Sequence, residues 1–316
     1  MTAPDDRPVL ALDVGGTKLA AGLVSPDGEV LSDLRVPTPS FEEGEGDLLW
    51  ATVHALLEDA RRDTDVAGVG IGCGGPMQWP AGLVSPLNIP AWGGYPLRAR
   101  VAEAYPGRPV RLHNDAVCFA VAEHWRGAGR GEPDLVGIVV STGVGGGLVL
   151  GGRVLDGGTG NAGHVGHLVV EPEGPSCACG GRGCLESVAS GPSTVRWAVA
   201  QGWQPPAGSE ASGRTLTLSA EGGDAVAVEA LARAGRAVGL AIASVAHLLD
   251  VRAFVVGGGL VVAGALVLDP LSQALAEHAR MPYVNDLTVR ASALGRRAGL
   301  VGAAALVAEP GYWTAD

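Results

Sequence analysis

Residues 9–37 read VLALDVGGTKLAAGLVSPDGEVLSDLRVP and contain three apolar runs that are separated by two turn sequences. A Gly-Gly pair follows the first run, and a Pro-Asp-Gly turn separates the second run from the third. Short apolar runs bounded by glycine, proline and aspartate are typical of β-strands joined by tight turns. The sequence therefore predicts three consecutive antiparallel strands at the start of the chain.

A second segment repeats this order of elements. Residues 134–155, DLVGIVVSTGVGGGLVLGGRVL, again place a strand, a glycine turn and a strand pair in succession. An α/β chain duplicated in this way is expected to form two lobes with a ligand-binding cleft between them. We predict a small N-terminal lobe of residues 1–117 and a larger lobe of residues 118–296. A C-terminal helix at 297–316 is expected to return to the first lobe.

Helices and loops fill the rest of the pattern. Apolar residues recur with helical spacing at 47–62 and again at 224–249. A buried strand is expected at 66–72, where the sequence is VAGVGIG. Segments rich in glycine, proline or small polar residues predict loops at 73–96 and at 205–223.

Composition excludes several classes of function. The 316 residues carry a formal net charge of −11 at pH 7, which argues against binding to nucleic acid or to an anionic membrane. No basic segment followed by an apolar one opens the sequence, so no secretion signal is expected. The most apolar stretch, 237–268, is interrupted by charged residues and glycines, which favours buried elements over a membrane span. We expect a cytoplasmic protein that acts on a small molecule.

Three glycine turns, each at the end of a predicted strand, are candidates for binding phosphate groups. Glycine allows backbone N–H groups to approach phosphate oxygens closely, and neighbouring hydroxyl or ammonium groups can donate further hydrogen bonds. An aspartate beside such a turn can hold Mg²⁺ directly or through water. The alternative for each motif alone is an ordinary turn. The residues concerned are Asp13, Gly15, Gly16, Thr17 and Lys18 in the first turn, Thr142 and Gly143 in the second, and Gly257, Gly258 and Gly259 in the third.

Asn114 and Asp115 lie where a predicted strand, PVRLHND, passes into a predicted helix. A carboxylate at this position could accept a proton from a substrate hydroxyl, and the neighbouring amide could orient the substrate. Asparagine and aspartate are also preferred N-cap residues of helices. Local sequence leaves both interpretations open and favours the cap.

The segment 160–186, GNAGHVGHLVVEPEGPSCACGGRGCLE, has the spacing H-x9-C-x-C-x4-C. Three thiolates and one imidazole complete a tetrahedral set, which is typical of structural rather than catalytic zinc. The ligands are His167, Cys177, Cys179 and Cys184. Unrelated free thiols are the alternative, and the two other cysteines, Cys73 and Cys118, lie in apolar surroundings that suit core residues.

These motifs together resemble the ROK family of sugar kinases from about residue 9 to about residue 307. The resemblance rests on DVGGTK, GGP at 74–76, LHND, STGVGGG, GNAG followed by GH, CACGGRGCLE and VVGGG, in the family's order and spacing. It implies a two-lobed actin-like ATPase fold, also described as ribonuclease-H-like. It further implies phosphorylation of a hexose, usually at O6, with ATP and Mg²⁺, a structural Zn²⁺ and commonly a homodimer, with a homotetramer as the alternative.

The resemblance also assigns roles to individual residues. Asp115 corresponds to the base that deprotonates the sugar hydroxyl, and Asn114 to the residue that orients the sugar. Glu186 corresponds to a sugar-binding glutamate, and His167 to a zinc ligand beside the sugar. The first two glycine turns correspond to the phosphate motifs and the third to the adenosine motif, with the residues given above.

Two positions depart from the family pattern. His164 stands where the family usually has a glutamate that binds the sugar, and Gln78 stands where it often has aspartate or asparagine. A neutral imidazole offers one hydrogen-bonding nitrogen of each kind and no second oxygen, so weaker binding of plain glucose is expected. Glucose is the default substrate, an amino or N-acetylamino hexose is the alternative, and ATP or polyphosphate is the donor. A DNA-binding repressor of this family would carry an additional domain ahead of Asp13 and is not favoured.

Overall fold

The computed structural model describes residues 5–312 and divides into two compact units. Unit 1 comprises Met1–Pro133, Gly147–Gly163 and Ala293–Asp316, and unit 2 comprises Asp134–Gly146 and His164–Ser292. The predicted boundary after residue 117 falls inside helix α3 (Asp115–Arg126), all of which lies in unit 1. The division into lobes at 1–117 and 118–296 stays a prediction.

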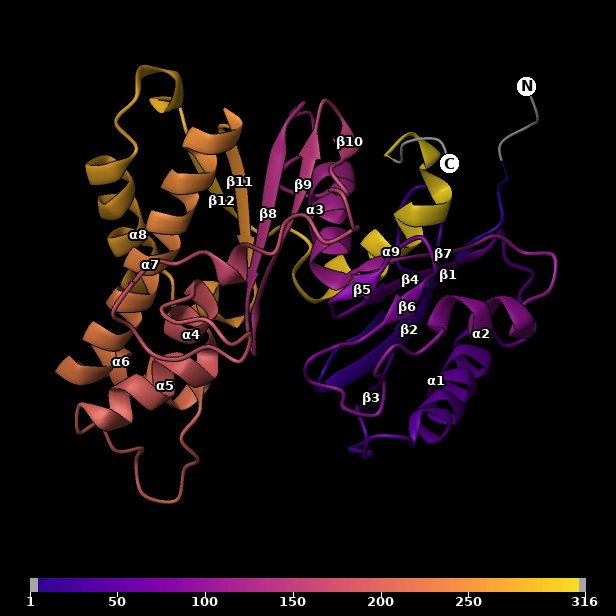
Figure 1. Ribbon diagram of the computed structural model, residues 1–316, viewed down its shortest axis with the longest axis horizontal. Helices are drawn as coiled ribbons and strands as arrows, with labels where there is room; N and C mark the ends of the chain where they lie inside the picture. The colour runs from indigo at the N-terminus through magenta and orange to yellow at the C-terminus, as the bar shows by residue number, and fades with distance from the viewer. Residues whose placement is uncertain (1–4, 313–316) are drawn as a thin grey trace. The chain divides into compact units, whose positions relative to one another are not determined.

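A five-stranded sheet forms the centre of unit 1, with the order β3-β2-β1-β4-β7 (Figure 1). The first three strands are antiparallel neighbours, as the sequence predicted, and β4 and β7 run parallel to β1. The bounds are β1 (Val9–Val14), β2 (Lys18–Val24), β3 (Leu34–Pro37), β4 (Val69–Cys73) and β7 (Val110–Asn114). The parallel strands end at the same edge, where Asn114 is the last residue of β7 and Asp115 begins the next helix.

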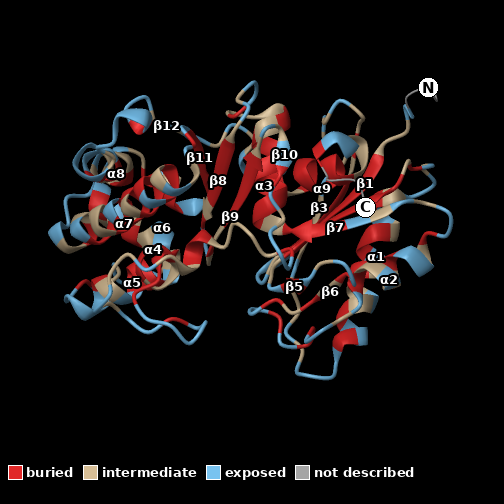
Figure 2. Ribbon diagram, turned by 45° about the horizontal axis from the view of Figure 1, so that its top comes forward, coloured by how far each residue is buried: buried red, intermediate tan, exposed pale blue. Residues whose placement is uncertain are grey.

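Helices cover both faces of this sheet because side chains alternate along each strand. Leu10, Leu12 and Val14 of β1 pack in one core with Leu49 and Val53 of α1 (Gly46–Arg61), and α2 (Leu97–Ala104) adds Leu97 and Val101 to the same core. The alternate residues of β1 face α9 (Ala298–Ala308) in a second core that contains Val9, Ala11, Leu300, Ala303 and Ala304. The central strands β1 and β4 of this sheet are almost entirely buried (Figure 2).

A second five-stranded sheet has the order β10-β9-β8-β11-β12, which repeats the order of the first sheet strand for strand. Its β10 and β9 are antiparallel, and β8, β11 and β12 are parallel. This confirms the predicted duplication. The bounds are β8 (Leu135–Val140), β9 (Val144–Leu150), β10 (Arg153–Val154), β11 (Ala253–Gly257) and β12 (Thr288–Ala291).

Strands β8, β11 and β12 of this sheet lie in unit 2, which also contains the helices that follow the cysteine-containing segment 160–186. These are α4 (Leu185–Ala189), α5 (Gly191–Ala200), α6 (Gly213–Glu221), α7 (Ala225–Leu249) and α8 (Ala265–His278) (Figure 1). The predicted helix at 224–249 is confirmed as α7, and the Asp224 carboxylate caps it by accepting from the N–H of Ala227 at 2.9 Å. Among residues 5–312, no helix is both long and apolar enough to cross a bilayer.

Three predictions of local structure were wrong. The predicted loop 205–223 contains α6, whose Ser212 cap accepts from Thr215 N–H at 3.2 Å while Leu216 and Ala220 are buried. The predicted loop 73–96 contains a short hairpin, β5 (Met77–Gln78) with β6 (Leu83–Val84). The C-terminal helix ends at Ala308 instead of 316, with a single 3₁₀ turn (Pro310–Tyr312) after it, and residues 313–316 lie outside the described part of the chain.

Candidate functional site

The junction between β7 and α3 carries the candidate base. Asn114 is buried and caps α3, because its side-chain oxygen accepts from Ala116 N–H at 2.9 Å. The Asp115 carboxylate accepts from the same N–H at 2.8 Å. Burial, together with the negative charge of Asp13, raises the pKa of Asp115 to about 6. Asp115 is therefore ionised at neutral pH, yet basic enough to take a proton from a hydroxyl during its reaction.

A buried histidine lies directly before these residues, and sequence reasoning did not single it out. The backbone N–H of Asn114 donates to Nδ1 of His113 at 2.8 Å, so the ring proton is on Nε2. Nε2 then donates to the Asp156 carboxylate at 2.8 Å. Nearby, the Asn161 side chain accepts from the N–H of Met77 and donates to its carbonyl, at 3.1 and 2.9 Å. The loop that holds Asp156 and Asn161 is thus fixed to β5 and to β7 within unit 1.

The first glycine turn follows β1 and is closed by a hydrogen bond from Gly15 N–H to the carbonyl of Lys18 at 3.0 Å. Gly16, Thr17 and Lys18 are exposed on this turn. Burial raises the pKa of Asp13, and the positive charges of Lys18 and Arg35 act against that rise. Because the charge of Asp13 also raises the pKa of Asp115, the structure brings the two carboxylates into one region of unit 1.

The second glycine turn, residues 141–144, lies in unit 2 and is held by its neighbours. Ser141 N–H donates to the Gly143 carbonyl at 2.8 Å, which forms the turn. Gly191 N–H at the start of α5 donates to the Ser141 carbonyl, also at 2.8 Å. The Glu186 carboxylate accepts from Val144 N–H at 2.8 Å. Thr142 is exposed.

The third glycine turn follows β11 and lies against the end of β8. Gly257 ends the strand, and the exposed Gly259 begins a 3₁₀ turn (Gly259–Ala263). Gly258 has φ of 94°, and a Cβ at this position would overlap the backbone of Val140. Only glycine satisfies both conditions. Since Val140 directly precedes the second turn, the structure places the second and third turns beside each other in unit 2.

The predicted zinc ligands come together. One atom from each of His167, Cys177, Cys179 and Cys184 lies within 4.8 Å of every other. The sulfurs of Cys179 and Cys184 are 3.8 Å apart, and Nδ1 of His167 is 3.8 Å from the sulfur of Cys177. Zinc–sulfur bonds of about 2.3 Å in a tetrahedron separate two sulfurs by about 3.8 Å. The four residues fit a zinc ion, and the two remaining cysteines are buried in unit 1.

His164 and Gln78 occupy different surroundings. The His164 ring is nearly parallel to that of His167, with centroids 6.1 Å apart and 12° between the planes. Its Nε2 is buried and has no hydrogen-bond partner among residues 5–312, and burial lowers the pKa of the imidazole. Gln78 is exposed in unit 1, on the hairpin that Asn161 fixes through Met77. In the described part of unit 2, His164 thus carries one buried ring nitrogen that no hydrogen bond satisfies.

Comparison with known proteins shows similarity along nearly the whole chain. A model of the ROK family matches residues 9–310. A glucokinase of Streptomyces coelicolor is 36% identical over 318 residues, covering 95% of this chain and 98% of the relative. An N-acetylmannosamine kinase of Shigella flexneri is 38% identical over 302 residues, covering 94% and 97%. A ROK family glucokinase from Streptomyces griseus, crystallised with glucose and AMPPNP, is 37% identical with a TM-score of 0.82, covering 95% and 98%.

Proposed function

The chain belongs to the ROK family, and we propose that it is an ATP-dependent kinase acting on the 6-hydroxyl of a hexose. The observation that carries the proposal is similarity to sugar kinases along nearly the whole chain, including a glucokinase structure that holds glucose and AMPPNP. The actin-like α/β fold predicted from the sequence is confirmed by the same comparison. The positions of Asp115 and the three glycine turns at strand ends support the chemistry.

In the proposed reaction, the Asp115 carboxylate accepts the proton of the sugar hydroxyl as its oxygen attacks the γ-phosphorus of ATP. A new P–O bond forms to the sugar, and the bond from the γ-phosphorus to the bridging oxygen breaks, which releases ADP. Asn114 is proposed to orient the sugar, and the glycine turns to hold the nucleotide with Thr17 and Lys18. Asp13 would hold Mg²⁺ directly or through water, and the bound ion would neutralise part of the phosphate charge.

Two kinds of hexose are candidates for the substrate. Glucose is the default substrate, because relatives that match nearly the whole chain are glucokinases. A specific observation favours an N-acetylamino hexose as the second candidate: the neutral, unsatisfied His164 replaces the family's glutamate, and an N-acetylmannosamine kinase is 38% identical. Glu186, His167 and Gln78 are the remaining residues proposed to contact the sugar.

A panel of hexoses with ATP, read by ADP release, tests the proposal. Glucose, mannose, glucosamine, N-acetylglucosamine and N-acetylmannosamine form the panel, and transfer from polyphosphate as a second donor is read by formation of the sugar phosphate. ADP formation with at least one sugar is the expected result, and mapping the product by NMR should place the phosphate on O6. No transfer to any of them would refute a hexose kinase, and preference for an N-acetylated sugar would replace glucose as the default.

The metal and the assembly complete the proposal. His167 and the three cysteines of the cluster are proposed to bind one Zn²⁺ that fixes their loop, because a closed set of four protein ligands leaves no position for substrate. A homodimer is the proposed assembly, with a homotetramer as the alternative. Elemental analysis and light scattering on the purified protein measure these two properties directly.

A further inference from the structure

We propose that Glu186 serves two subsites at once: one carboxylate oxygen holds the second glycine turn, and the other receives the sugar. The sugar half rests on the proposed function, whereas the contact with the turn is independent of it. Oε2 of Glu186 accepts from Val144 N–H at 2.8 Å. The preceding residue of the turn, Gly143, leaves room for this approach, because a Cβ there would lie 2.7 Å from the same oxygen.

The turn has few other supports, so the carboxylate is central to its conformation. Gly191 N–H anchors one end at the Ser141 carbonyl, and Gly166 packs so closely on Val144 that a Cβ would overlap its carbonyl oxygen. Glu186 is the side chain that reaches the turn from α4, and it does so from two residues after the metal ligand Cys184. The turn proposed to bind phosphate is thereby linked to residues 160–186, which we call the metal-binding segment.

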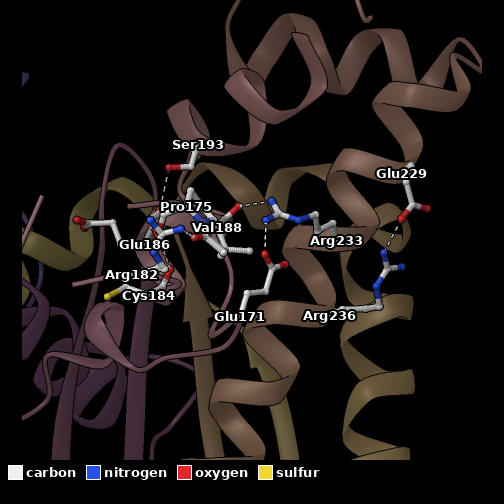
Figure 3. A network of polar contacts seen from close by, with 12 residues as sticks. Glu171, Pro175, Arg182, Cys184, Glu186, Val188, Ser193, Glu229, Arg233 and Arg236 are labelled. Atoms are coloured by element: carbon white, nitrogen blue, oxygen red, sulfur yellow. Dashed lines mark hydrogen bonds and ion pairs between the residues drawn. The ribbon is translucent and has the colours of Figure 1, made fainter. Parts of the chain in front are cut away.

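The backbone that carries Glu186 is itself anchored (Figure 3). Ser193 Oγ donates to the carbonyl of Glu186 at 3.0 Å. Arg233 of α7 donates to the Glu171 carboxylate at 2.6 Å and to the Val188 carbonyl at 3.4 Å, which ties both the metal-binding segment and α4 to α7. Since α4 is fixed from these directions, the Glu186 side chain presents its carboxylate from a defined position.

The second oxygen of Glu186 is available. Within residues 5–312, no hydrogen bond reaches Oε1, and the carboxylate points away from Arg233 in Figure 3. Each oxygen of an ionised carboxylate can accept hydrogen bonds, so an N–H on Oε2 leaves Oε1 free for a hydroxyl. The geometry therefore allows one side chain to bind sugar while it shapes the turn. A residue that only bound sugar would leave the turn, and the affinity for nucleotide, unchanged.

Two variants separate these roles when AMPPNP binding is measured by calorimetry without sugar. Glu186→Ala removes both acceptors, and its AMPPNP affinity should fall about tenfold, the effect of one lost hydrogen bond to a charged group. Glu186→Gln keeps one carbonyl oxygen for Val144 N–H but offers an amide nitrogen in place of the second oxygen. Its AMPPNP affinity should stay within about threefold of wild type, while the KM for sugar rises about tenfold.

Hydrogen exchange and a neighbouring variant provide the controls. Faster amide exchange in residues 141–144 is expected for Glu186→Ala, and this readout needs neither nucleotide nor sugar. Ser187→Ala changes the next residue of α4, whose hydroxyl donates to the Cys184 carbonyl at 2.8 Å, and should leave AMPPNP affinity and exchange in the turn unchanged. Zinc content should equal that of wild type in all three variants.

The outcomes are distinct. Wild-type AMPPNP affinity together with wild-type exchange in Glu186→Ala would overturn the proposal, as would equal loss of nucleotide affinity in the glutamine and alanine variants. If the wild-type protein phosphorylates no hexose, the proposed function fails, but the exchange experiment still decides whether Glu186 holds the turn.

Discussion

Asparagine in place of Asp115 should lower turnover by orders of magnitude and, at neutral pH, stabilise the fold. Asn keeps an oxygen that accepts from Ala116 N–H but carries no charge to bury. Burial and Asp13 raise the pKa of the wild-type carboxyl from 3.8 to about 6. A shift of about two units corresponds to roughly 3 kcal/mol at most. Judged by its exposed surface area, the Asp115 side chain is only partly buried, and solvent screens its charge. We therefore expect Asp115→Asn to raise the free energy of unfolding by about 1–2 kcal/mol.

The direction in which stability changes with pH follows from the number of protons that the folded and unfolded states bind. Because the folded-state pKa is raised, the folded protein binds more protons than the unfolded chain between pH 3.8 and about 6, and stability is lost as pH rises through this window. The asparagine variant has no such loss. Its Tm should exceed that of wild type at pH 7.5 by a few degrees, since about 1 kcal/mol shifts the Tm of a domain this size by about 2–4 °C. At pH 4 the difference should shrink, because Asp115 is then largely protonated.

Activity supplies the second half of this test. Loss of a general base should lower kcat by a factor of about 10²–10⁴, and wild-type kcat/KM should fall below an apparent pKa near 6. Calorimetric unfolding of both proteins at pH 7.5 and pH 4, with steady-state kinetics from pH 5 to pH 8, measures all of these quantities. A variant that keeps turnover, or that is less stable than wild type at pH 7.5, would contradict the assignment of Asp115 as a buried base.

Three further predictions concern other parts of the site. Cys184→Ser should lower bound zinc below one ion per chain and lower the Tm, and unchanged metal content would argue against the four-ligand set. Asp156→Ala removes the hydrogen bond between Asp156 and the ring of His113 and should lower kcat/KM for sugar by about tenfold, whereas Asp156→Asn, which still accepts, should recover most of it. His164→Glu restores a second oxygen and should lower the KM for glucose relative to N-acetylmannosamine; an unchanged ratio would exclude His164 from sugar selection.

The sequence predicted the elements whose patterns are local. The strands before the glycine turns combine apolar runs with obligatory turn residues, so their positions were readable without tertiary information. The edge strand β12 was missed because Thr288–Ala291 is largely exposed and lacks an apolar run. Helix α2 was missed for a similar reason, since only Leu97 and Val101 of its residues are buried. Helix α6 depends on two buried residues and a serine cap inside a polar segment.

The candidate site shows the same division between local and distant information. Spacing alone predicted the four metal ligands, and the structure gathers them. The partnership of His113 with Asp156 joins residues 43 apart, and a single histidine in an apolar strand gives no spacing signal. The N-cap and base interpretations of the β7–α3 junction also proved compatible, because Asn114 caps the helix while Asp115 retains a carboxylate of raised pKa.

The two sheets have equivalent glycine turns, so differences between the turns depend on the side chains that contact each of them. Both sheets have the same strand order, so in each the first strand pair is joined by a glycine turn and the chemistry depends on what contacts that turn. In unit 1, Asp13 precedes the turn and α9 packs close to it, where a Cβ on Gly299 would overlap the Asp13 carboxylate. In unit 2, the carboxylate that reaches the turn is Glu186, which comes from a different segment. The two equivalent turns therefore have carboxylates from different places in the chain: the position of Asp13 beside its turn follows from adjacent sequence, whereas the contact of Glu186 with its turn is visible only in the fold.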